Sequence, residues 1–148
     1  MKIDIRLLNC LWLILPILVW NIILGPRITD ARITSDSFSP KWLLITENVS
    51  RIFVFMLPLL MPLQLKDITS KAGLWIYIIG TLVYFASWLP ILFAPQSAWS
   101  NSPAGLLAPR LTPFLVFLGI ALIGHSWPYG VIAALLIFVH TWHGVQNF

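Results

Sequence analysis

Charged side chains are scarce in this chain of 148 residues. Lys and Arg together number nine and Asp and Glu five, or 9% of the sequence, against about 25% in soluble domains. No charged residue occurs between positions 72 and 109, and none follows Arg110. A soluble fold would have no solvated face along such stretches, and its 59% hydrophobic residues would form large exposed apolar patches. The sequence therefore excludes a soluble domain and predicts an integral membrane protein.

Several features that mark known chemistry are also missing. The one cysteine, Cys10, cannot form an internal disulfide, and no zinc-binding CxxC spacing exists. The motifs GxSxG, SxxK and HExxH and the phosphate-binding loop are absent. The net charge of +4 is scattered without a basic stripe, which argues against nucleic acid as a partner. We expect no cofactor and no resident metal, and the lipid bilayer as the main partner.

Apolar stretches separated by polar turns predict the membrane topology, because about 20 helical residues cross roughly 30 Å of hydrocarbon. Gly25-Pro26 indicates the end of the first stretch, and Ser39-Pro40 the capped start of the second. The segment 94–109, rich in Pro, Ser and Ala, indicates a loop that dips into the interface near 99–107, with the alternative that GLLAPR, residues 105–110, lengthens the short fourth span. We predict an all-α, polytopic bundle forming one domain, 1–148, with five transmembrane helices at about 7–24, 40–63, 72–93, 111–124 and 128–145.

Two aspects of this topology have alternatives. With four spans, residues 111–145 would form one broken helix, and the HSWPYG segment would lie at mid-bilayer with free backbone groups that cost several kcal/mol each. Five spans are therefore favoured. Lys and Arg are divided evenly between the two sides, but the first helix often sets the orientation. We expect a multi-pass protein of the bacterial inner membrane with its N-terminus inside. The even charge division also leaves the opposite orientation open.

The segment TENVSRIFVF, residues 46–55, places polar groups inside an apolar span. Glu47 precedes Arg51 by four residues, the favourable order for an ion pair on one helix face. At about 1.5 Å per residue from Pro40, Glu47 lies ~10 Å and Arg51 ~16 Å inside the membrane. An unpaired charge at the bilayer centre costs at least roughly 2.5–3.5 kcal/mol. We therefore expect this face, with Asn48 beside it, to turn towards the bundle interior.

Antiparallel spans bring other polar residues to the same depth. Tyr84 and Trp88 belong to a stripe on the third span, Arg110 begins the fourth, and His140 and His143 share a face near the end of the fifth. Gly73, Gly80 and Ser87 form a small-residue stripe that indicates a close helix contact. The predicted ligand-binding set is Glu47, Asn48, Arg51, Tyr84, Trp88, Arg110, His140 and His143.

This set is compatible with more than one function. An intramembrane pocket that binds a small amphipathic or anionic ligand, or a lipid, is the first interpretation, with a role as a transporter or complex subunit. A membrane-embedded enzyme would use Glu47 and His140 as acid and base on a lipophilic substrate. Glu47 with both histidines would also suit a divalent metal. The remaining alternative is a purely structural partner protein, in which the ion pair only stabilises the bundle. Each of these functions is compatible with a homo-oligomer or with a partner in a membrane complex.

Overall fold

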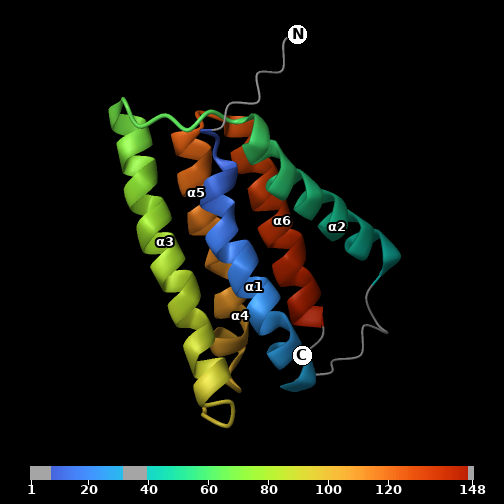
Figure 1. Ribbon diagram of the computed structural model, residues 1–148. Helices are drawn as coiled ribbons and strands as arrows, with labels where there is room; N and C mark the ends of the chain where they lie inside the picture. The colour runs from blue at the N-terminus through green and yellow to red at the C-terminus, as the bar shows by residue number, and fades with distance from the viewer. Residues whose placement is uncertain (1–7, 32–39, 147–148) are drawn as a thin grey trace.

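The computed structural model describes residues 8–31 and 40–146, and helices build this part of the chain (Figure 1). The one extended pairing within these residues is an isolated bridge between Asn9 and Pro62. The helices are α1 (Leu11–Ala31), α2 (Lys41–Met56) with the 3-10 helix η2 (Leu57–Leu60), α3 (Ile68–Phe93), α4 (Pro103–Leu111), α5 (Pro113–Ile123) and α6 (Trp127–Gln146). The predicted all-α bundle is confirmed.

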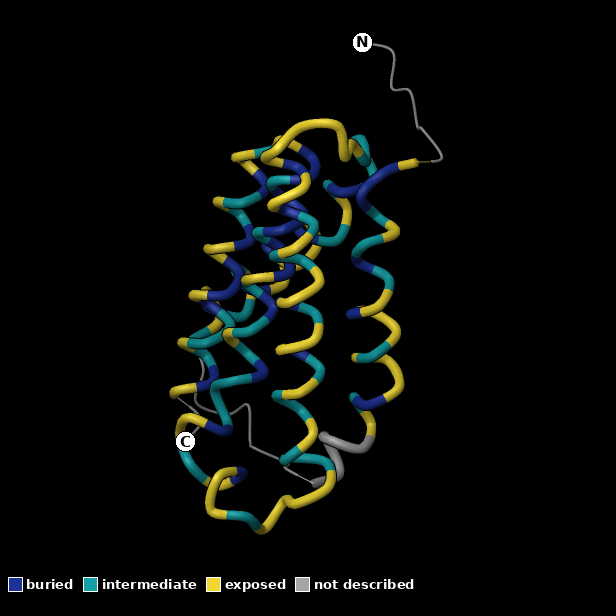
Figure 2. The backbone as a smooth tube through the Cα atoms, turned by 90° about the vertical axis from the view of Figure 1, so that its left-hand side faces the viewer, coloured by how far each residue is buried: buried dark blue, intermediate teal, exposed yellow. Residues whose placement is uncertain are grey.

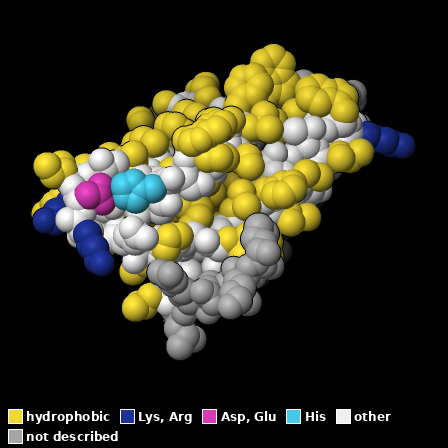
Figure 3. Space-filling model, turned by 90° about the horizontal axis from the view of Figure 1, so that it is seen from above, with side chains coloured by type: hydrophobic (Ala, Val, Ile, Leu, Met, Phe, Trp, Pro, Cys, Tyr) yellow, Lys and Arg dark blue, Asp and Glu magenta, His cyan; other side chains and the backbone are white. Residues whose placement is uncertain are grey.

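Length and composition suit these helices to a bilayer. Four segments are long and apolar enough to cross a membrane, and the apolar part of α1, Leu11–Pro26, is shorter. Exposed residues lie on the outward sides of the helices and buried residues face inwards (Figure 2). Large hydrophobic side chains remain exposed, such as Trp75, Phe93 and Phe138, and they cover much of the surface in Figure 3. This apolar exterior requires lipid contact, which makes the chain an integral multi-pass membrane protein.

The predicted loop over residues 94–109 is wrong in its second half, where the structure instead agrees with the alternative in which residues 105–110 lengthen the fourth span. Residues 103–111 form α4, which continues through Thr112 into α5 to give a span over Pro103–Ile123. Ser102 caps the start, because its hydroxyl accepts from the backbone N–H of Gly105 at 3.0 Å, and Pro103 follows in the first turn. The fourth span therefore starts about two turns earlier than the predicted 111–124, because this proline begins a helix instead of breaking one.

Other boundaries shift by smaller amounts. α1 continues through Gly25 and Pro26 instead of ending there. α2 begins at Lys41, next to the predicted Pro40, and the proposed cap Ser39 lies outside the described residues. Beyond Met56 the backbone changes to a 3-10 turn with Pro58 in its first positions, since proline cannot continue the α-helical hydrogen bonding. α3 starts at Ile68, a turn before the predicted residue 72.

The turn between α5 and α6 shows that residues 111–145 do not form one long broken helix. α5 ends at Ile123, and Gly124 closes it by donating to the carbonyl oxygen of Ile120 at 2.9 Å. His125 adopts a positive φ of 49°, and α6 begins at Trp127. Figure 1 shows α5 and α6 side by side, running in opposite directions to and from this turn. Residues 111–145 are therefore two antiparallel segments.

Close helix contacts hold α3 against α5. A Cβ on Gly73 would lie 2.9 Å from the carbonyl oxygen of Gly119, and one on Gly80 would lie 2.9 Å from the backbone nitrogen of Val116. The predicted small-residue contact on α3 is thus confirmed at both glycines. Backbones approach this closely only where no side chain intervenes.

Helix α1 lies against α3 through aromatic residues. The Tyr77 hydroxyl donates to the carbonyl oxygen of Leu13 at 2.9 Å. About two turns further along both helices, the rings of Trp20 and Phe85 stack with centroids 4.3 Å apart. These contacts hold α1 alongside α3, and the polar side chains gather next to the second of them.

Candidate functional site

Glu47 is the centre of a buried polar cluster between α2 and α6. Its residue is 5% exposed, and its carboxylate forms three contacts with side chains. Oε1 accepts from the Arg51 guanidinium and lies 2.8 Å from Nδ1 of His140, while Oε2 lies 2.7 Å from Nδ1 of His143. The structure thus brings together four of the residues expected from the sequence. Helical spacing explains the pattern, since residues three or four apart share a face.

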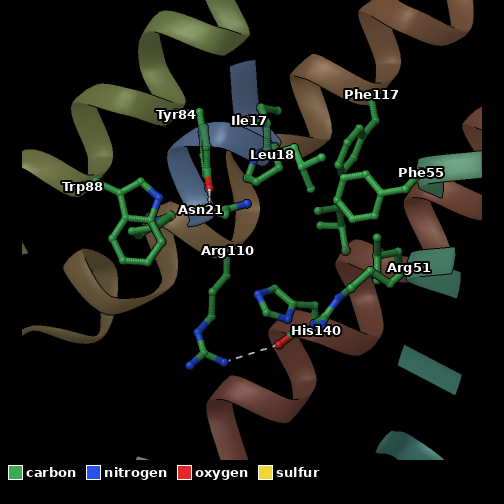
Figure 4. Close-up of a pocket in the computed structure, with 14 residues that line it drawn as sticks. Ile17, Leu18, Asn21, Arg51, Phe55, Tyr84, Trp88, Arg110, Phe117 and His140 are labelled. Atoms are coloured by element: carbon green, nitrogen blue, oxygen red, sulfur yellow. Dashed lines mark hydrogen bonds between the residues drawn. The ribbon is translucent and has the colours of Figure 1, made fainter. Parts of the chain in front are cut away.

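Hydrogen bonding to the carboxylate fixes the orientation of the His140 ring. An ionised carboxylate only accepts hydrogen bonds, so Nδ1 of His140 carries the proton in this contact. In the neutral imidazole, Nε2 is then an acceptor. Figure 4 shows the ring projecting into the space between Arg51 and Arg110. An imidazole oriented by a carboxylate, with its second nitrogen available, is the arrangement of a general base, and it equally suits hydrogen bonding to a ligand.

A cavity of about 420 Å³ adjoins this cluster and is lined by residues from α1 through α6 (Figure 4). Its polar wall consists of Asn21, Arg51, Tyr84, Trp88, Arg110 and His140. Its apolar wall consists of Ile17, Leu18, Phe55, Pro109, Pro113, Phe117, Leu136 and Ile137. Five of the eight predicted ligand-binding residues therefore line one cavity, and Glu47 and His143 support it from behind His140.

Arg110 reaches across α6 from α4. Its Nη1 donates to the carbonyl oxygen of His140 at 3.5 Å, shown as the dashed line in Figure 4. A Cβ on Gly144 would overlap this guanidinium group. Sequence reasoning missed Gly144, because its importance depends on a side chain from another helix.

Tyr84 and Asn21 form the wall of the cavity opposite α6. The Tyr84 hydroxyl donates to Oδ1 of Asn21 at 2.5 Å, and Tyr84 is buried. Trp88 packs edge-on against Tyr84, with ring centroids 6.4 Å apart and an interplanar angle of 86°. Asn21 was missed in the sequence, although an amide within the apolar run VWNIIL was a usable signal.

Asn48 does not belong to this cavity, contrary to the expectation from the sequence. The residue is exposed on α2, and it is not among the lining side chains. Adjacent helical residues are separated by about 100° around the axis, because one turn takes 3.6 residues. When Glu47 points at α6, its neighbour is therefore directed away from it.

The charges around the cavity favour an anion. Among the described residues in this cluster, two arginines and two histidines surround a single carboxylate. With both imidazoles neutral, the formal balance is already positive, and protonation of either would increase it. The Arg51 side chain is 45% exposed, so part of its charge remains available beyond Glu47.

The histidines and Glu47 are arranged as hydrogen-bonding partners. Each imidazole presents Nδ1 to a different carboxylate oxygen. Within residues 8–31 and 40–146, no group of three His, Cys, Asp or Glu side chains is placed to hold a metal ion.

A second polar cluster caps the opposite end of the bundle. Asp67 accepts from the backbone nitrogens of Thr69 and Ser70 at the start of α3, and His125 Nε2 lies 3.0 Å from its Oδ1. The Ser70 hydroxyl, and then His125, hold the pKa of the Asp67 carboxyl below its usual range. Both Ser70 and Asp67 contact the same imidazole nitrogen, so this is a helix cap and not a catalytic triad. Figure 3, which looks onto this end, shows an acidic side chain touching a histidine at the surface.

Comparisons of the chain with protein-family models, with curated proteins and with solved structures gave no significant match.

Proposed function

We propose that the cavity binds an amphiphile with an anionic headgroup and an apolar tail. The observation that supports this most directly is that Arg51 and Arg110 both lie at one end of the cavity, while the wall at the other end is apolar. Guanidinium groups bind carboxylates and phosphates through charge-assisted, often bidentate hydrogen bonds. His140, whose ring is hydrogen-bonded to Glu47, provides a third polar group that can bind the headgroup.

The order of lining residues along the helices supports the division between headgroup and tail. On α2, Arg51 lies a turn nearer the helix start than Phe55, and on α6, His140 lies a turn nearer the helix end than Leu136. Because α2 and α6 run in opposite directions, both polar residues lie towards the same end of the bundle (Figure 1). Along α4 and α5, Arg110 likewise lies nearer this end of the bundle than Phe117. The polar end is therefore assembled independently from three segments.

The volume of the cavity suits a small ligand. Ligand pockets commonly measure about 300–1,000 Å³ and combine an apolar lining with a few placed polar groups. At about 420 Å³, this cavity lies near the lower limit of that range. A headgroup with a single aliphatic chain fits this description.

We also propose an orientation of the protein in the membrane. The polar end of the cavity lies at the end of the bundle where α6 finishes, opposite the start of α1 (Figure 1). We place the N-terminus in the cytoplasm of a bacterium, on the basis of Lys2 and Arg6 before the first span. The headgroup would then lie on the outer side of the inner membrane.

Replacing Arg110 by glutamine is expected to weaken binding of monododecyl phosphate by about 10- to 100-fold. A hydrogen bond to a charged group contributes about 1.5–3 kcal/mol, and about 1.4 kcal/mol corresponds to a factor of ten. The measurement is a titration of the purified protein by isothermal calorimetry in a non-ionic detergent. The matched control is Lys71→Gln, which removes an exposed charge at the start of α3; its affinity should equal that of the wild type. Equal binding of uncharged dodecanol, or no effect of Arg110→Gln, would contradict the proposal.

A further inference from the structure

We infer that the occupant is a single-chain anionic lipid of the membrane itself, and that it enters sideways from the bilayer through a mouth between α1 and α2. The inference rests on the proposed function and adds the source and route of the ligand. Three observations support it: which lining residues are exposed, what surrounds them, and where the charge lies.

The exposed lining residues locate the mouth. Among the lining residues, those that are exposed are Leu18 and Asn21 on α1 and Arg51 on α2. The lining residues from α3, α4, α5 and α6 are buried or half-buried. Figure 4 shows Leu18 and Asn21 on one side and Arg51 on the other side of the cavity. The cavity therefore opens between α1 and α2 and is closed by the other helices.

The surroundings of the mouth are apolar. Val19 and Ile22 on α1 are 50% and 66% exposed, and Ile52 and Phe53 on α2 are 61% and 48% exposed. Val19, Ile22 and Ile52 each follow an exposed lining residue in the sequence and lie about 100° further around the helix axis. They therefore belong to the exposed surface next to the opening. Side chains of this kind on a membrane-spanning helix face acyl chains. A lipid diffusing in the bilayer thus meets the mouth directly, whereas a dissolved anion would have to cross this apolar surface.

Charge complementarity selects the lipid class. Arg51 lies at the mouth with its guanidinium bound to Glu47 on one side, and Arg110 lies deeper, against α6. An anionic headgroup that enters would meet Arg51 first and then Arg110. The volume of about 420 Å³ accommodates one chain more readily than two. Monoacylglycerol phosphates, that is lysophosphatidic acids, combine these properties.

The experiment uses photoreactive lysophosphatidic acid, with a diazirine in its acyl chain, in phosphatidylcholine vesicles that contain the full-length protein. In the wild type we expect labelling on peptides that contain Phe117 or Leu136. Leu18→Trp narrows the mouth and should reduce this labelling several-fold, while Leu18→Ala should label at least as strongly as the wild type. The matched control is Leu82→Trp, the same substitution at a 64% exposed position on α3 that does not line the cavity, and its labelling should be unchanged.

Each alternative outcome overturns a defined part of the inference. Full labelling of Leu18→Trp would show that the route does not pass between α1 and α2. Competition by glycerol phosphate in water as effective as that by the lipid would show that the ligand comes from solution. Equal labelling by a diacyl phosphatidic acid would refute the single-chain selectivity. If monododecyl phosphate binds in detergent but no labelling occurs in vesicles, lateral entry fails while the proposed function stands; failure of both refutes the proposed function itself.

Discussion

Replacing Glu47 by alanine is expected to lower the free energy of unfolding by about 3–5 kcal/mol, the cost of removing one partner from a buried ionic cluster. The carboxylate is nearly inaccessible and satisfies donors from Arg51, His140 and His143 at once. Its loss leaves the two imidazoles of α6 without the acceptor that orients them. Average polar contacts in membrane proteins contribute only about 0.6 kcal/mol, so the expected loss clearly exceeds that of an ordinary helix contact.

Arg51→Ala is the matched control for this prediction, because it removes the other charge of the same ion pair. The Arg51 side chain is 45% exposed, and Glu47 keeps both histidine contacts in its absence. We expect a loss of about 1 kcal/mol at most, as for exposed ion pairs. Reversible unfolding in mixed micelles with increasing dodecyl sulfate measures both variants. Equal losses for the two variants would show that Glu47 is no more than one half of a surface pair.

Replacing Gly119 by leucine is expected to separate α3 from α5 and to cost more than the roughly 1–3 kcal/mol typical of an overpacked core. A Cβ at this position would lie 2.6 Å from the backbone nitrogen of Tyr77 and 2.7 Å from the carbonyl oxygen of Gly73. Both neighbours are backbone atoms, so no side chain can rotate to relieve the overlap. The same unfolding measurement should show a lower midpoint for Gly119→Leu, with Gly119→Ala in between.

Gly130→Ala is the control for the glycine prediction. Its added Cβ would meet only the Cβ of Ala121, at 3.5 Å, an ordinary contact. Alanine is favoured over glycine inside a helix by about 1 kcal/mol, so this variant should be as stable as the wild type or slightly more stable. If Gly119→Leu behaved like Gly130→Ala, the close approach of α3 and α5 would be refuted.

The sequence predicted that four polar side chains meet, because the depth of a residue in the membrane follows from the order and direction of the spans. These residues are Glu47, Arg51, His140 and His143. When spans alternate in direction, counting residues from each helix end shows which side chains reach the same level. This reasoning needs only the number of spans and the rise per residue. It also predicted Arg110, Tyr84 and Trp88 correctly as neighbours of this region, although it missed Asn21, which shares a wall with Tyr84.

Rotation about a helix axis was harder to predict than depth. Asn48 has the same depth as Glu47 but faces outwards, because the direction of a helix face is set by packing against partners that the sequence does not name. For the same reason, Gly144 became relevant only once Arg110 was seen to lie over it.

Helix α4 shows a different limit of sequence reasoning. Its segment SPAGLLAPRL contains two prolines and a glycine, a composition typical of a loop. The proline at the start is compatible with a helix because its missing N–H is not needed there. Pro109 lies near the joint with α5. Composition alone therefore favoured a loop, while the positions of the prolines within the segment permit a helix.

The most direct test of the account is an experimental structure of the protein in lipid nanodiscs with monododecyl phosphate. We predict density for the phosphate between Arg51, Arg110 and His140, with the chain beside Phe117 and Leu136, and the Glu47 carboxylate bound to both imidazoles. A structure in which aliphatic side chains fill the cavity and Glu47 lies apart from His140 and His143 would contradict the account.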